Sequence, residues 1–175
     1  MANKISREGR KKLVKIFLIR SGITYLMWQI TYYGFILPHG KVNLFLTNLV
    51  IKGTVFGLDL LGYETIGEGR IVTIDSEPVV LVGDSCNGLE LFVLYSGFLL
   101  CFPGKIKYKL FFIPIGISII FILNVIREIT LSLNYKFFRE SFEFNHKYTY
   151  VMVVYLTVFA IWRFWLKKYS AISSN

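Results

Sequence analysis

Cysteine and histidine are scarce in this chain, with two of each, Cys86, Cys101, His39 and His146, among 175 residues. Two cysteines cannot build a disulfide framework. If both lay on one helix, their separation would be about 22 Å, whereas a disulfide needs Cα atoms within about 7 Å. No C-x-x-C occurs and the histidines are far apart, so there is no zinc pattern. We therefore predict two free thiols and no metal site.

The chain also lacks the short motifs of nucleotide-binding proteins and serine hydrolases. Neither G-x-G-x-x-G, a P-loop nor G-x-S-x-G occurs in it. Aromatic residues are plentiful, with 16 phenylalanines and 11 tyrosines. We interpret them as lipid-facing packing and an interfacial belt rather than as a cofactor site. No cofactor is therefore predicted.

Charge is nearly absent from long stretches, while 54% of the residues are hydrophobic and the mean hydropathy is +0.54. A water-soluble fold of this length could not bury so much apolar surface. Residues 4–15 carry six basic side chains against one acid, Glu8. A pI near 9.6 alone would permit nucleic-acid binding, but this uneven distribution indicates membrane orientation. We predict a single membrane domain, residues 1–175, with membrane lipids as partners and no nucleic acid.

Four stretches reach the roughly 20 apolar residues that a transmembrane helix needs. They cover about residues 16–37, 85–104, 110–133 and 147–166. The first follows a basic segment without a small-residue cleavage pattern. We therefore expect it to be a retained span rather than a removed signal peptide.

The segment 41–84 is predicted to lie outside the spans, on the outer side of the membrane. Lys52 and Asp59 interrupt its first part, which we predict to be an amphipathic helix in the interface. Residues 71–82 are expected to form two short strands, joined by a turn at Ser76, Glu77 and Pro78. The predicted fold class is an all-α polytopic membrane protein, with four transmembrane helices, an outer interfacial amphipathic helix and a small β-hairpin.

The positive-inside rule supports four spans with both termini in the cytoplasm. Twelve Lys and Arg residues then fall in the cytoplasmic segments, against six in the longer outer segments. A fifth span at residues 42–61 would move Lys105, Lys107 and Lys109 outside and weaken this bias. Four spans are therefore the better count.

Three reactive side chains are predicted to share one depth near the outer face. Cys86 opens the second span, and His146 immediately precedes the fourth. Arg127 follows Leu110 by 17 residues, which places it about 26 Å up a hydrocarbon core about 30 Å thick. A thiolate nucleophile, an imidazole that moves protons and a cation that stabilises an oxyanion suffice for acyl transfer on a peptide bond.

Residues near Cys86 are predicted to support it. Asn87, with Glu90 three residues later, suggests a helix cap, and backbone dipoles at such a helix start favour a thiolate. His146 stands beside Asn145 at another helix start, where the neutral form of a base is favoured.

Each residue also has a structural interpretation. Arg127 could simply pair with Glu90 or Glu128, since intramembrane charges usually have partners. Cys86 alone could be a small packing residue, and His146 alone could be a solvated loop histidine. The remaining cysteine and histidine, Cys101 and His39, are predicted to be non-catalytic.

The local sequences DSCNGL (84–89) and NVIR (124–127), with His146 opening the last span, resemble motifs of the exosortase/archaeosortase family. Members are multi-pass transpeptidases proposed to process C-terminal sorting signals. The order and spacing agree over roughly residues 40–166. Asn87 stands where many relatives carry Ser. Many exosortases have about twice as many spans, so the chain looks like a short, core-only member similar to those of the Bacteroidetes.

The resemblance implies a membrane cysteine protease or transpeptidase at the outer face of a bacterial cytoplasmic membrane. Cys86 would be the nucleophile, His146 the acid/base and Arg127 the transition-state cation, supported by Asn87, Glu90 and Asn124. Substrates would be secreted proteins with a C-terminal motif, a hydrophobic span and a basic tail. The alternative is a non-catalytic scaffold or accessory subunit of an envelope export or assembly system. A transporter fits poorly because the polar groups lie toward one edge.

Overall fold

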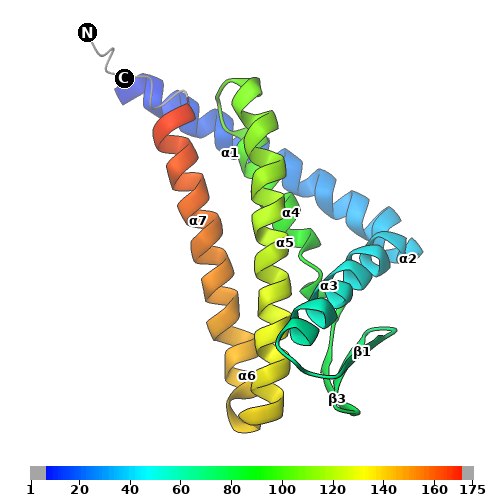
Figure 1. Cartoon of the computed structure of the whole chain (residues 1–175). Helices are drawn as coiled ribbons and strands as arrows, with labels where there is room; N and C mark the ends of the chain where they lie inside the picture. Colours follow the sequence, from blue (N-terminus) through cyan, green and yellow to red (C-terminus); the bar gives the residue numbers. More distant parts are fainter. Residues whose placement is uncertain (1–6, 171–175) are drawn as a thin grey trace.

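A computed structural model describes residues 7–170 of the chain (Figure 1). Part of the basic N-terminal segment, including Lys4, lies outside the described residues. The principal elements are α1 (Arg7–Thr31), α2 (Leu37–His39), α3 (Lys41–Leu60), β1 (Thr65–Glu68), β2 (Ile71–Ile74), β3 (Glu77–Leu81), α4 (Leu89–Cys101), α5 (Ile106–Phe137), α6 (Phe142–Phe144) and α7 (Tyr150–Tyr169). A π-helical turn, Tyr32–Ile36, joins α1 to α2, and another, Asn145–Thr149, joins α6 to α7.

Three helical stretches within residues 7–170 are long and apolar enough to cross a membrane. They are Lys11–His39, Ile106–Phe137 and Arg139–Tyr169. Each contains one of the predicted spans, namely the first, the third and the fourth. The mostly helical character of the chain and these three spans therefore agree with the sequence prediction.

The predicted second span, residues 85–104, is a shorter helix, so the count of four spans is not confirmed. α4 has 13 residues and is about 20 Å long, whereas the hydrocarbon core is about 30 Å thick. The helix begins late because Gly88, with φ 83°, takes a left-handed conformation. It ends at Cys101 because Phe102 precedes Pro103 and is extended.

The predicted helix at residues 41–62 is α3, but the predicted hairpin is part of a three-stranded antiparallel sheet with the order β1-β2-β3. The additional strand β1, of sequence TIGE, has few of the residues that favour strands. The turn also differs from the prediction, because Asp75 and Ser76 form it with φ values of 51° and 67°. A two-residue hairpin turn of this kind needs two left-handed residues, so Glu77 and Pro78 fall within β3.

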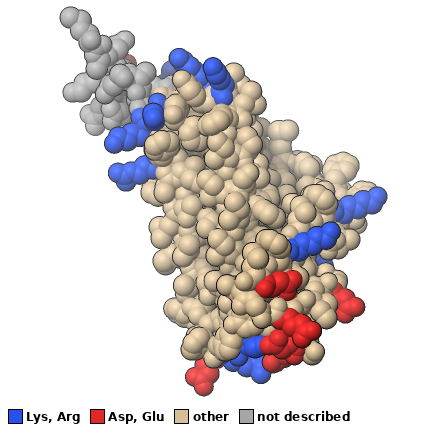
Figure 2. Space-filling model, viewed as in Figure 1, with Lys and Arg blue, Asp and Glu red and all other residues tan. Residues whose placement is uncertain are grey.

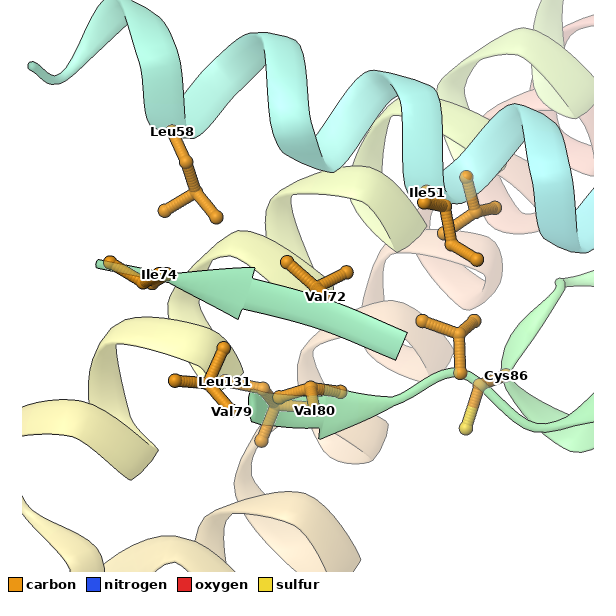
Figure 3. Packing of buried hydrophobic residues seen from close by; sticks show 10 residues of the cluster. Ile51, Leu58, Val72, Ile74, Val79, Val80, Cys86 and Leu131 are labelled. Carbon is orange, nitrogen blue, oxygen red and sulfur yellow. The ribbon is translucent and has the colours of Figure 1, made fainter. Parts of the chain in front are cut away.

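The sheet packs between α3 and α5. Figure 3 shows Ile51 and Leu58 of α3 facing Val72 and Ile74 of β2, while Leu131 lies near β3. Burial of these apolar side chains is the main force that holds the sheet on the helices. β3 therefore reaches the Cys86 turn from a sheet that two helices fix in place.

An ion pair between a helix side chain and a turn of the sheet also ties the sheet to α5. The ammonium of Lys136 hydrogen-bonds the carboxylate of Asp75 in the turn between β2 and β3. This bond holds the pKa of the Asp75 carboxyl below its ordinary value. The pair therefore favours the folded position of the turn above the ordinary pKa of aspartate, and its contribution is lost as the pH falls through the lowered value.

The helices α4, α5 and α7 share a second core. Its fully buried side chains include Tyr95, Leu99, Ile120, Val158 and Trp165. The hydroxyl of Tyr95 donates to the carbonyl of Phe112 on α5, at 2.8 Å. Figure 1 shows α5 and α7 running beside each other, while α1 crosses the bundle obliquely.

Charge is distributed unevenly between the two ends of the molecule. Figure 2 shows only Lys and Arg side chains at the end where α7 finishes, whereas the Asp and Glu side chains gather at the opposite end with the sheet, together with some further Lys and Arg side chains. The face between them is largely uncharged. This distribution is the one that the positive-inside rule predicts when the termini are cytoplasmic and the sheet lies outside.

We predict that Gly116→Ala destabilises the contact between α4 and α5. A Cβ at Gly116 would lie 2.1 Å from Cζ of Tyr95, a fully buried ring held by its hydroxyl bond. Such overpacking lowers the free energy of unfolding by about 1–3 kcal/mol. Thermal unfolding in detergent, followed by circular dichroism, measures the change.

Gly22→Ala is the matched control, because it makes the same substitution in α1 where nothing lies within 4 Å. We expect its unfolding temperature to equal or exceed that of the unmodified chain. Equal unfolding temperatures for the two variants would contradict the close approach of α4 and α5.

Candidate active site

Cys86 ends a short 3-10 turn between the sheet and α4. After β3 the chain continues to Gly83, and the turn Asp84–Cys86 begins, closed by the Cys86 N–H, which donates to the Gly83 carbonyl at 2.9 Å. Figure 3 shows the Cys86 sulfur pointing away from α3. The side chain is 8% exposed. The nucleophile candidate is therefore held on a tight turn rather than within a helix.

The cap at the start of α4 differs in its residues from the one that the sequence predicted. Gly88 is the N-cap residue of α4, and Asn87 accepts a hydrogen bond from the Leu89 N–H at 2.9 Å. Glu90 makes no reciprocal capping bond with Asn87 among the described contacts. Asn87 therefore supports the start of α4, but the predicted cap with Glu90 is wrong.

Buried amides fix the Cys86 turn from two sides. From α5, the Asn124 amide donates to the Cys86 carbonyl at 2.5 Å. From the α3 side, the amide of Asn87 donates to the side-chain oxygen of Asn43 at 3.1 Å. All three asparagines are at most 3% exposed. Asn43 was not predicted, although a polar residue with Thr47 one helical turn later was a signal that α3 faces something other than lipid.

Arg127 reaches the thiol from the same face of α5 as Asn124. Its Nη2 lies 3.7 Å from Cys86 Sγ, and its Nη1 donates to Glu128 Oε1 at 2.7 Å. The side chain of Arg127 is about one-tenth exposed and that of Glu128 is 1% exposed. Of the two partners considered for Arg127, Glu128 is the one that the structure shows. The guanidinium thus lies between a thiol and a carboxylate.

Glu128 is the residue whose position the sequence suggested least clearly. Neighbouring residues of a helix point in different directions, so an ion pair between Arg127 and Glu128 was only one of two alternatives. Their side chains are long enough to meet despite this. The signal was an adjacent Arg and Glu at the end of an uncharged stretch of a spanning helix.

His146 lies in the π-helical turn that leads into α7. Its ring stacks on Phe142 with a centroid distance of 5.7 Å, and the charge of Arg127 acts on it electrostatically. Together with Glu128, it lines a cavity of about 390 Å³ whose other wall is formed by β3. The described residues show no hydrogen bond between His146 and Cys86. The structure therefore joins Cys86 to Arg127 directly and places His146 beside the carboxylate that holds Arg127.

Glu90 lies apart from this cluster. It lines a separate groove of about 480 Å³ between α1 and α4, together with aromatic residues such as Tyr25 and Trp28. Arg127 pairs with Glu128 instead of Glu90, and the supporting role of Glu90 stays a prediction. Cys101 also lines this groove and shares a hydrogen bond with Thr24 at 3.1 Å. His39 contacts the Phe35 carbonyl at the end of α2.

The arrangement has the elements of thiol chemistry on a carbonyl group. A guanidinium beside a sulfur stabilises negative charge both on the thiolate and on an oxyanion formed next to it. The carboxylate of Glu128 fixes the guanidinium by a charge-assisted hydrogen bond. The imidazole of His146 lines the same cavity as Glu128, and an imidazole is a group that can transfer protons.

We predict that Glu128→Gln is strongly destabilising, because it leaves the guanidinium of Arg127 buried without its counterion. Breaking a buried ion pair in this way costs about 3–5 kcal/mol. The double variant Arg127→Gln, Glu128→Gln removes both charges and should be closer in stability to the unmodified chain. Unfolding temperatures in detergent measure all of these variants. If the double variant were destabilised by the sum of the effects of Arg127→Gln alone and Glu128→Gln alone, the result would contradict a direct pair.

Comparison of the sequence with known proteins identifies the family to which the chain belongs. Neither the curated proteins nor the solved structures yielded a match. A family model described as Transmembrane exosortase (Exosortase_EpsH) matches residues 13–164. The match includes the Cys86 turn, the face of α5 that carries Arg127, and His146, and it extends over most of the chain. The chain belongs to the transmembrane exosortase family.

Proposed function

We propose that this chain is a membrane cysteine transpeptidase or protease that processes C-terminal sorting signals of secreted proteins. Membership of the exosortase family supports this class of activity. The observation that carries the proposal is the contact of Cys86 Sγ with Arg127 Nη2 at 3.7 Å. A buried thiol held against a guanidinium, beside a cavity with an imidazole, suits attack on a peptide carbonyl.

In the first half of the reaction, His146 takes up the proton that the Cys86 thiol loses, and the Cys86 thiolate attacks the scissile carbonyl carbon to form a C–S bond. The carbonyl oxygen takes the negative charge, which the Arg127 guanidinium stabilises. When this intermediate collapses, the C–N bond breaks and His146 gives a proton to the leaving amine. A thioester between Cys86 and the N-terminal part of the substrate remains.

In the second half, an amine acceptor attacks the thioester carbonyl and His146 accepts its proton. The C–S bond breaks, the Cys86 thiolate leaves, and a new amide is formed. Water in place of the amine gives a carboxylic acid and makes the same reaction a hydrolysis. Restricted water at the membrane interface favours the amine.

The proposed setting is a bacterial cytoplasmic membrane, with the termini inside and the sheet and Cys86 at the outer face. The separation of basic and acidic ends in Figure 2 supports this orientation. The proposed substrates are secreted proteins whose C-terminal region carries a motif, a hydrophobic span and a basic tail. The hydrophobic span of such a substrate would be anchored in the same bilayer and would present its outer end to Cys86.

The non-catalytic scaffold is less well supported. In that alternative, an ion pair between Arg127 and Glu90 would hold two helices together. Arg127 instead pairs with Glu128 on its own helix, and Glu90 lines another groove. This ion pair joins no two helices, so its position near Cys86 is better explained by chemistry at the thiol.

We predict that Cys86→Ala and Cys86→Ser abolish the processing of exported proteins. Membranes from cells with each variant are digested, and mass spectrometry compares the C-terminal peptides of anchored secreted proteins. Proteins that lose their C-terminal anchor only in the presence of an intact Cys86 are the substrates. The physical reason is that no thioester forms without the thiol, and a serine hydroxyl ionises far less readily than a thiol and is a much weaker nucleophile.

Cys101→Ala is the matched control, since it removes the other buried thiol. Processing should continue in this variant at the level of the unmodified chain. Unchanged C-terminal peptides in the Cys86 variants would contradict the proposed activity.

A further inference from the structure

β3 is an edge strand, and it leads directly to the candidate nucleophile. It pairs with β2 on one side, and no strand within residues 7–170 pairs with its other side. Pro78 lies within it, and proline is tolerated in sheets at edges because it has no N–H to donate. Leu81, the last residue of β3, precedes Cys86 by five positions.

The register shows which backbone groups of this edge are available. The Val82 N–H donates to the Arg70 carbonyl at 2.8 Å, and the next pair along is Leu81 with Ile71. Hydrogen-bonded and non-hydrogen-bonded pairs alternate in an antiparallel ladder. The N–H and C=O of Leu81 therefore point away from β2. Among residues 7–170, no backbone hydrogen bond reaches Leu81 from outside the sheet.

The space beside this edge is the cavity that His146 lines. Its lining includes Val79, Val80 and Leu81 of β3 together with Glu128 and His146. The volume of about 390 Å³ lies within the range of ligand sites, about 300–1,000 Å³. An edge strand with free backbone groups, the imidazole and the carboxylate that holds Arg127 thus border one cavity.

We propose that β3 binds the substrate by strand addition, with an extended peptide segment pairing with the free edge at Leu81. This inference rests on the proposed function, because the segment bound is the one that precedes the scissile bond. Main-chain hydrogen bonds supply affinity in this mode, and alternate side chains of the peptide enter the cavity. The peptide runs parallel to β3, so that both chains continue from the sheet toward the level of Cys86.

The other edge of the sheet is less suited to this role. β1 lies against α3, and a Cβ at Gly67 would meet Ile51 at 2.6 Å. β1 also leads from α3 into β2 rather than toward Cys86. The outward amide of Gly67, which is opposite Val72 in a non-hydrogen-bonded pair, therefore provides an internal comparison for Leu81.

The first experiment measures amide hydrogen exchange of the full chain in lipid nanodiscs, with and without a synthetic octapeptide of alternating valine and threonine. We expect the peptide to slow exchange at Leu81 about tenfold, as one added hydrogen bond permits, and to leave Gly67 unchanged. The controls are two N-methylated forms of the same peptide. Each form carries methyl groups on every second amide, one form along one edge of the extended peptide and the other form along the opposite edge. At least one methylated form should give no protection.

Other occupants of the edge give different results in this experiment. Protection of Leu81 that rises with protein concentration and needs no peptide would show pairing with a second copy and overturn the proposal. Equal protection by all peptides, or none by any, would also overturn it. These outcomes do not depend on turnover, so they separate failure of strand addition from failure of the proposed chemistry.

The second experiment compares Leu81→Pro with Leu81→Ala in cells. Both remove the side chain, which is 67% exposed, but only proline removes the outward N–H. We expect Cys86-dependent processing to fall about tenfold further in the proline variant than in the alanine variant, the effect of one lost hydrogen bond. Equal processing at equal levels of folded protein, checked by the unfolding temperature, would contradict the role of this amide.

Discussion

One face of α5 fixes the relative positions of the candidate site and the sheet. Asn124, Arg127 and Leu131 follow one another at helical spacing on this face. The first binds the Cys86 carbonyl, the second approaches the Cys86 sulfur, and the third packs in the core of the sheet. The thiol, its cation and the strand that leads to the thiol therefore share one rigid support. A shift of α5 along its axis would disturb all of these contacts together.

Stability alone does not account for the ion pair on this helix. Arg127 and Glu128 are both largely removed from solvent, and removing two charges from water costs about as much as, or more than, their attraction returns. Apolar side chains of similar size in their place would often be neutral or stabilising. A charge pair kept next to a thiol fits the proposed function, in which a fixed cation would stabilise negative charge as it develops.

The sequence predicted features that depend on periodicity and depth, and missed those that depend on distant partners. Hydropathy predicted four spanning helices, of which the structure has three, and the distance from Leu110 along a helix predicted that Arg127 lies at the level of Cys86, with which it makes a 3.7 Å contact. The predicted length of the second span was wrong because a left-handed Gly88 delays the start of α4 to Leu89 and an extended Phe102 ends it after Cys101. Asn43 was missed because its partner Asn87 is 44 residues away. The choice between Glu90 and Glu128 depended on which side of α4 faces α5, and composition does not reveal that.

An extended binding mode also solves a problem that membrane-anchored substrates share. The carbonyl groups of a helical anchor are occupied by hydrogen bonds within the helix, so a thiolate cannot attack a scissile bond there until the chain unwinds. Unwinding near the bilayer exposes backbone groups that cost several kcal/mol each when they lack partners. The free N–H and C=O of Leu81 can satisfy part of this demand, five residues before Cys86. Under the proposed function, a small sheet attached to spanning helices would give an otherwise mostly helical protein a surface on which a peptide is held extended while it reacts.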